Sequence, residues 1–261
     1  NLSDLAAMGA EPRACTLGIA LPEVDEAWLQ AFAAGLHALA ERHRCPLIGG
    51  DTTRGPLNVC VTVLGVVPRG QALRRDAARV GDDIWVSGTL GAAAWAVSAR
   101  ARGQALAPSH PARQRLDWPQ PRLALGRALC GRAACAIDIS DGLSGDLGHV
   151  LERSGCGAAL EWARIPVDPA LQGCDERDRH ALVLGGGDDY ELLFTAPAPS
   201  RGEIAALGER VGTPVSRIGS ITAQPGISLL RPDGSVERIA ARGFDHFGAA
   251  TSASARPGPC A

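Results

Sequence analysis

Three oxygen-bearing side chains, Asp138, Ser140 and Asp141, stand close together near the middle of the 261-residue chain. The apolar run 133–137 precedes them and an amphipathic stretch over 143–153 follows, so we predict a strand, a tight turn and a helix. Asp138 and Ser140 then share one face of the strand. Carboxylate and hydroxyl oxygens suit a hard cation such as Mg²⁺, and a helix N-terminus suits a phosphate.

A simpler interpretation is that Ser140 or Asp141 only caps the helix, because both residue types are common at helix starts. Capping does not account for Asp138, which places a second carboxylate at the end of an apolar strand. An unpartnered charge is costly to bury there. These residues alone leave both interpretations open.

Two other glycine-rich segments also present acids beside apolar strands. Gly50 and Asp51 follow a short strand predicted over 46–48, and the glycines would let a ligand or another backbone approach closely. Asp188 follows the glycine run 185–187 and precedes another apolar strand. The alternatives are a turn with an Asx cap for the first segment and a solvated loop for the second. We predict that the acids of all these turns meet at one pocket, together with an acid at a helix start: Asp4, Asp51, Asp138, Asp141, Asp188 and Asp189.

Carboxylates brought together in this way repel one another. Two unit charges about 4 Å apart cost on the order of 4 kcal/mol at an effective dielectric constant of about 20. Several Mg²⁺ ions that bridge the carboxylates to a polyphosphate would turn this cost into binding. The same ions would allow phosphoryl transfer onto an acceptor that is itself anionic, and such an acceptor needs no activated protein nucleophile.

The composition excludes several classes of protein. The net charge of −2 gives no sign of a nucleic-acid or anionic-membrane surface, and no apolar run approaches the length of about 20 residues that a membrane span needs. The eight cysteines form no CxxC pair and the given residues contain no signal-peptide pattern, so we expect a cytoplasmic protein. All 26 basic residues are arginine. A Walker A, protein-kinase or Schiff-base lysine is therefore excluded from this chain.

Periodicity and turn signals give the expected order of elements. We predict strands over 15–21, 46–48, 58–67, 84–88, 133–137, 157–162, 192–194, 215–221, 227–230 and 236–239, and helices over 3–8, 90–101, 120–130, 143–153, 180–184 and 201–211. A further helix opens at Asp25, and its apolar stripe is expected to face the core. We place a domain boundary near residue 79, which gives domains over 1–78 and 79–248 and a disordered tail over 249–261.

Five segments in order resemble the motifs of the thiamine-monophosphate kinase family, which belongs to the aminoimidazole-ribonucleotide synthetase superfamily. They are 1–10, 48–55, 137–143, 186–194 and 243–247. The resemblance covers essentially the whole chain except the tail. It implies an α+β fold with two α/β sandwich-like domains, each a mixed sheet flanked by helices. The first domain would bind ATP and metal and form a homodimer with its counterpart.

The resemblance also implies an activity, namely ATP- and Mg²⁺-dependent phosphorylation of thiamine monophosphate to thiamine diphosphate by direct in-line γ-phosphoryl transfer without a phosphoenzyme. By motif, the metal ligands would be Asp4, Asp51, Asp138 and Asp141, of which the last three would be catalytic. The nucleotide contacts would be Gly50, Asp51, Arg75 and Ser140, and the substrate contacts would be Asp188 and Phe244.

Three departures from the family pattern stand out. The first segment of the family is absent, so we expect an N-terminally truncated chain that could be inactive. Asp188 stands where the family often has Glu, and Phe244 stands where Tyr is common. The alternatives to this activity are a sister synthetase acting on aminoimidazole ribonucleotide or selenophosphate precursors, and an inactive nucleotide-binding dimerisation fragment.

Overall fold

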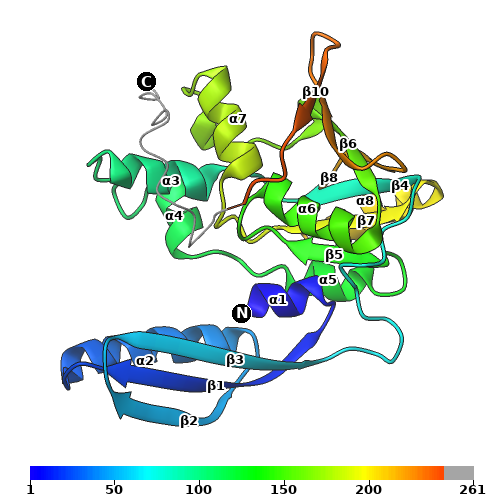
Figure 1. The fold of residues 1–261 in the computed structure, drawn as a ribbon. Helices are drawn as coiled ribbons and strands as arrows, with labels where there is room; N and C mark the ends of the chain where they lie inside the picture. Colours follow the sequence, from blue (N-terminus) through cyan, green and yellow to red (C-terminus); the bar gives the residue numbers. More distant parts are fainter. Residues whose placement is uncertain (244–261) are drawn as a thin grey trace.

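The chain forms a small sheet and a large sheet, and the short N-terminal helix α1 (Leu2–Ala7) lies between them (Figure 1). The computed structural model describes residues 1–243. Phe244 and the predicted disordered tail therefore lie outside the described residues. No helix within the described part is both long enough and apolar enough to cross a membrane.

The small sheet has the strand order β2-β1-β3. Its strands are β1 (Glu11–Leu21), β2 (Leu47–Arg54) and β3 (Asn58–Val66), with β1 parallel to β2 and antiparallel to β3. A parallel pair needs a crossover connection. Helix α2 (Glu26–Arg42) supplies it and begins where the Asp25 side chain accepts the Trp28 N–H at 3.0 Å.

Strand β2 differs from the prediction, because it continues through the glycines to Arg54 instead of turning after residue 48. The reason is the parallel pairing of Gly50 with Leu17. Gly50 has φ +153°, and a Cβ at this position would stand 1.9 Å from the Leu17 carbonyl oxygen. The glycine therefore lets another backbone approach closely, which is one of the two roles the sequence suggested for this segment.

The large sheet has seven strands in the order β10-β9-β6-β8-β4-β7-β5. They are β4 (Asp82–Ser87), β5 (Cys135–Asp138), β6 (Gly157–Glu161), β7 (Leu192–Pro197), β8 (Val215–Thr222), β9 (Gly226–Leu230) and β10 (Val236–Ile239). β6 and β9 run parallel, whereas the other neighbours are antiparallel. The predicted α+β fold with mixed sheets and flanking helices is confirmed.

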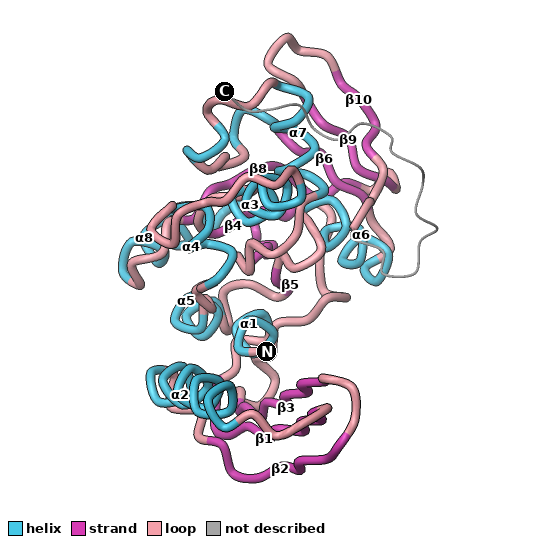
Figure 2. Tube along the Cα trace, turned by 90° about the vertical axis from the view of Figure 1, so that its left-hand side faces the viewer, coloured by secondary structure: helices cyan, strands magenta, loops and turns pink. Residues whose placement is uncertain are grey.

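Helices cover both faces of the large sheet (Figure 2). They are α1 (Leu2–Ala7), α3 (Ala92–Ala101), α4 (Pro111–Asp117), α5 (Leu123–Leu129), α6 (Leu143–Ser154), α7 (Glu176–Gly185) and α8 (Arg201–Arg210), with 3₁₀ turns over Trp162–Arg164, Pro169–Leu171 and Ala198–Ser200. Successive side chains of a strand point to opposite faces of the sheet, so the apolar core is divided into one cluster on each face. Ile84 packs in the cluster that contains Leu147 of α6, whereas Trp85 packs with α5 on the opposite face and stacks on Phe194.

Helix α1 precedes the small sheet in sequence but packs against α5 and β5 of the large one. The contact is close, because a Cβ at Gly126 would stand 2.0 Å from the Ala6 carbonyl oxygen. Ala6 and Ala7 are buried in the same cluster as Leu125 and Leu129. This packing places the acid-bearing turn of α1 beside the end of β5.

Three helices depart from the predicted pattern. The stripe of α2 does not face a core, since Ala40 alone is buried in this helix and Leu39 is 42% exposed. Helix α4 lies between the helices predicted over 90–101 and 120–130, where no helix was predicted. It begins with Pro111 after His110, whose ring nitrogen accepts the Ala112 N–H. Helix α7 is longer than predicted, because Asp175 caps it one turn earlier.

Candidate functional site

Two of the acid-bearing turns lie side by side and are joined by backbone hydrogen bonds. The Asp188 N–H donates to the Ser140 carbonyl at 2.9 Å, and the Tyr190 N–H donates to the Ile139 carbonyl at 2.8 Å. In return, the Ile139 N–H donates to the Glu191 carbonyl at 2.8 Å. The segment after β5 and the segment before β7 thus extend the edge pairing of these strands, and they carry their side chains to one place.

The second of these turns has a strained backbone. Asp188 and Tyr190 both adopt positive φ, at 66° and 50°, although neither is glycine. Such residues cost on the order of 1–3 kcal/mol each and gather at sites where the surrounding structure holds them for a purpose. The strain supports a functional role for this turn over the alternative of a solvated loop.

Asp138, at the end of β5, is only 5% exposed. Burial raises the pKa of this carboxyl above its ordinary value, and the nearby Asp4 carboxylate adds to the increase, while the Ser3 hydroxyl and the Arg75 charge work in the opposite direction. Asp4, Asp138 and Arg75 are therefore neighbours, although they come from α1, β5 and the connection after β3. A buried carboxylate beside a second one favours a cation between them.

Asp141 and Asp188 share the surroundings of Tyr190. Burial raises the pKa of the Tyr190 hydroxyl, and the carboxylates of Asp188, Asp138 and Asp141 raise it further. Oxygen donors without sulfur or imidazole are the ligands that Mg²⁺ prefers, so these side chains fit that ion. Within residues 1–243, however, no group of three or more His, Cys, Asp and Glu side chains is already arranged to hold a metal.

The start of α6 shows whether Ser140 or Asp141 caps this helix, as the simpler interpretation of the sequence proposed. Gly142 occupies the N-cap position, and no side chain forms a cap hydrogen bond there, so neither Ser140 nor Asp141 is used as a cap. Instead Asp146 Oδ2 accepts the backbone N–H groups of Ser140, Asp141 and Gly142, each at 3.1 Å. Burial raises the pKa of Asp146 to about 6. The capping interpretation was therefore wrong, and the sequence did not indicate Asp146.

Glu191 anchors the second turn from behind and was also missed. It is fully buried and accepts hydrogen bonds from Ser87 Oγ, from Arg115 Nη2 at 2.7 Å and from Arg122 Nε at 2.7 Å. Burial alone would raise the pKa of this carboxyl, but the hydrogen bond and charge of Arg122, the charge of Arg115 and the Ser87 hydroxyl hold it below its ordinary value. Its partners are distant in sequence, so no local signal marked them.

Asp189 points to the start of α3. Its Oδ2 accepts the Gly91 N–H at 2.9 Å, while Oδ1 has no hydrogen-bond partner among the described residues. Burial raises its pKa to about 7. The side chain therefore fixes the loop to α3 from the inside.

Gly50 and Asp51 are not brought to this place within one chain. Both are exposed on β2, and Figures 1 and 2 show this edge strand on the side of the small sheet away from β5. Asp51 Oδ1 accepts the N–H of Thr52. Phe244 lies outside the described residues, and Gly243, the last described residue, lies against Asp141, with 3.2 Å between its would-be Cβ and the Asp141 Cβ.

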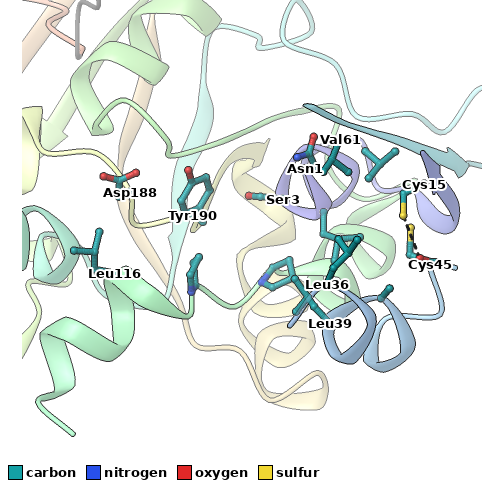
Figure 3. A pocket seen from close by; sticks show the side chains of 15 residues that line it. Asn1, Ser3, Cys15, Leu36, Leu39, Cys45, Val61, Leu116, Asp188 and Tyr190 are labelled. Carbon is teal, nitrogen blue, oxygen red and sulfur yellow. Dashed lines mark hydrogen bonds between the residues drawn. The ribbon is translucent and has the colours of Figure 1, made fainter. Parts of the chain in front are cut away.

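A cavity of about 400 Å³ opens beside the two turns (Figure 3). Asp188, Tyr190 and Ser3 line it together with apolar side chains of β1, α2, β3, α4 and the connection between α4 and α5, among them Cys15, Leu36, Leu39, Val61 and Leu116. Its walls come from the small sheet and α2 on one side, and from α1, α4 and the turn before β7 on the other. Local sequence patterns therefore could not reveal it.

The fold and the site define a protein related to AIR synthase. The family model for the N-terminal domain of AIR synthase related proteins matches residues 1–67, and that for the C-terminal domain matches residues 79–231. Thiamine-monophosphate kinase of Salmonella typhimurium is 42% identical over 252 residues, which covers 95% of this chain and 77% of that protein. The Haemophilus influenzae enzyme of the same name is 40% identical over 253 residues, with the same coverage. The chain belongs to the thiamine-monophosphate kinase family.

Solved structures agree with this assignment. The crystal structure of thiamine-monophosphate kinase from Stenotrophomonas maltophilia K279a superposes with a TM-score of 0.84 at 48% identity, covering 90% of this chain and 76% of that one. The structure of AaThiL complexed with AMPPCP and TMP superposes with a TM-score of 0.78 at 26% identity, covering 95% and 77%. The hydrogenase maturation protein HypE, at 20% identity and a TM-score of 0.77, shares the fold.

Proposed function

We propose that this protein transfers the γ-phosphoryl group of ATP to the phosphate of thiamine monophosphate and so forms thiamine diphosphate. The observation that carries the proposal is the pair of hydrogen-bonded turns that gathers Asp138, Asp141 and Asp188 beside Asp4. Membership of the family and the likeness to AaThiL complexed with AMPPCP and TMP support the choice of substrates.

Mg²⁺ is the metal that the donor set favours. Asp4, Asp138 and Asp141 would hold it in one chain, with Asp51 as a further ligand once β2 is brought to the site. When bound, Mg²⁺ would screen the phosphates of both substrates and polarise the transferred group. The protein's own contribution is to hold these carboxylates in place before the substrates arrive.

The remaining residues take the roles that the family motifs suggest, and the positions of those in the described part support them. Arg75 lies close enough to Asp138 to lower that carboxyl's pKa, so it is placed to neutralise a phosphate of the nucleotide, with Ser140 as a hydroxyl contact. Asp188 is placed to contact thiamine monophosphate, as Phe244 would be by motif. The phosphate oxygen of the acceptor is already charged, and no protein side chain has to remove a proton from it.

A homodimer would explain the surface of the small sheet. Apolar side chains are left exposed on β2, β3 and the connection between them: Ile48 (63%), Leu57 (59%), Val59, Leu64 and Val66. Exposed apolar groups gathered on one sheet mark an association surface. A second copy packed on this sheet could also bring Gly50 and Asp51 to an active site, since one chain does not do so by itself.

The activity is tested with ATP and Mg²⁺ in the presence of either thiamine monophosphate or thiamine. We expect transfer to thiamine monophosphate and none to thiamine, which has no phosphate to accept the group. Equal transfer to both acceptors would contradict the proposal. Nucleotide binding without transfer to either would favour the non-catalytic alternative.

The shared site is tested by mixing two inactive variants, Asp51→Asn and Asp141→Asn. If each active site takes Asp51 from one copy and Asp141 from the other, mixed dimers contain one intact site and activity returns on mixing. If Asp51 reaches the Asp141 of its own chain, the mixture stays as inactive as its components. Sedimentation of the unmodified protein gives the oligomeric state independently.

A further inference from the structure

The buried carboxylate of Asp146 binds the backbone of the turn that carries Ser140 and Asp141. The residue is 3% exposed, and its Oδ2 is the shared acceptor for the N–H groups of Ser140, Asp141 and Gly142, all at 3.1 Å. Hydrogen bonds to a carboxylate are stronger than neutral ones. One side chain therefore fixes the orientation of three consecutive peptide groups.

These three bonds determine where the neighbouring side chains stand. Gly142 lies at φ +120°, and a Cβ there would stand 2.8 Å from the Gly185 carbonyl carbon, so the turn is in close contact with the C-terminal end of α7. With its amides held from inside by Asp146, the turn leaves the Ser140 hydroxyl and the Asp141 carboxylate free for other partners.

The electrostatics of this arrangement argue against a purely structural role. Asp146 Oδ2 accepts the Asp141 N–H, so a third acid stands beside two others at the turn that follows Asp138. A neutral acceptor such as Asn or Ser would serve a helix start at lower electrostatic cost. The three backbone N–H groups offset part of this further negative charge, and a divalent cation bound by the neighbouring acids would offset more of it.

We propose that Asp146 is a positioning residue for the metal-binding acids, which holds the Ser140–Gly142 backbone so that Asp141 meets a divalent cation together with Asp138. This inference rests on the proposed function for the identity of the metal and for the role of Asp138 and Asp141 as its ligands. In this proposal Asp146 acts through the backbone of Asp141, whose N–H it accepts, and not as a ligand of the metal itself.

The test compares Asp146→Ala and Asp146→Asn with a matched control, Asp83→Asn. Asp83 is another buried acid. It lies on β4, away from the two turns, and forms ion pairs with Arg201 and Arg217. Mg²⁺ binding is measured by calorimetry without substrates, and amide hydrogen exchange is followed by mass spectrometry in peptides that cover residues 139–143. Thermal unfolding gives the stability of each variant.

We expect Asp146→Ala to weaken Mg²⁺ binding by about tenfold or more, as the loss of outer-shell partners does elsewhere, and to accelerate exchange at residues 140–142. Asp146→Asn keeps an acceptor oxygen and should recover slow exchange and most of the affinity. Asp83→Asn should lower thermal stability while it leaves both readouts unchanged.

Unaltered Mg²⁺ affinity or unaltered exchange in Asp146→Ala would overturn the proposal. So would a loss of affinity in Asp83→Asn as large as that in Asp146→Ala, because general loosening would then explain both. If Asp146→Ala does not fold, Asp146→Asn decides alone: slow exchange with bound Mg²⁺ supports positioning, and slow exchange without Mg²⁺ binding overturns it. None of these readouts uses thiamine monophosphate, so failure of the proposed function would be recognised separately.

Discussion

Gly187 lies so close to Ser140 that a Cβ at position 187 would stand 2.2 Å from the Ser140 carbonyl oxygen. The contact is made between the two acid-bearing turns themselves. Any side chain at this position would force them apart, and a displacement of about 1 Å at such a site can cost on the order of a hundredfold in rate.

Gly187→Ala should therefore reduce turnover by about a hundredfold and destabilise the fold by about 1–3 kcal/mol through overpacking. Gly185→Ala is the matched control from the same glycine run, since nothing lies within 4 Å of a Cβ at that position. Steady-state kinetics and urea unfolding of both variants decide the matter. Equal activity in the two would show that the close approach of the turns is not needed.

Asp141→Asn should lower turnover by about 10²–10³-fold with little change in unfolding free energy, because the side chain is half-buried and makes no cap. Asp117→Asn is the control, an exposed acid on α4 paired with Arg113. Rates are measured over a range of Mg²⁺ concentrations and after removal of metal with a chelator. A near-normal rate in Asp141→Asn would remove this residue from the proposed metal ligands.

Glu191→Gln should destabilise the protein by about 3–5 kcal/mol, because it leaves Arg115 and Arg122 without their buried counter-charge. The surface pair between Arg132 and Glu203 provides the comparison, and Glu203→Gln should cost less than about 1 kcal/mol. Denaturant unfolding measures both. A similar loss of unfolding free energy in the two variants would mean that the buried ion pairs of Glu191 stabilise the fold no more than a surface pair does.

Acid should weaken the fold partly through Asp83. Burial would raise the pKa of this carboxyl, but hydrogen bonds from Arg201 and Arg217 hold it below its ordinary value. A lowered pKa in the folded state stabilises the protein above the unfolded pKa of about 3.9, and this contribution is lost as pH falls through the folded value. Thermal unfolding of Asp83→Asn between neutral pH and pH 3 should show a smaller decline than that of the unmodified chain. A parallel decline would exclude Asp83 as a source of acid sensitivity.

Local patterns predicted the strand, turn and helix around Asp138 well, because an apolar run, a glycine and a helical repeat follow one another there. They failed at β2, where Gly50 looks like a turn in sequence and is in fact the place where two parallel strands touch. The deciding partner, Leu17, lies more than thirty residues away.

The same distance in sequence explains what was missed in the site. The hydrogen-bond partners that identify Glu191 as an anchor are Ser87, Arg115 and Arg122, all far from it along the chain. Asp146 sits at an ordinary helical position, and only the folded turn shows that it faces backwards to the amides of 140–142. By contrast, the proximity of Asp4 to Asp138 agrees with the prediction that scattered acids meet, although Asp51 stays on the small sheet in one chain.

The packing of α1 on α5 has a practical consequence for dissecting the molecule. A cut near residue 79, where sequence places the border, would leave α1 attached to the small sheet and strip Ala6 and Ala7 from the apolar surface they cover. The liberated large half would then expose that surface and lose Asp4 as well. A fragment of the large sheet that is meant to fold alone would also need residues 1–9, joined to it so that α1 again packs against Gly126.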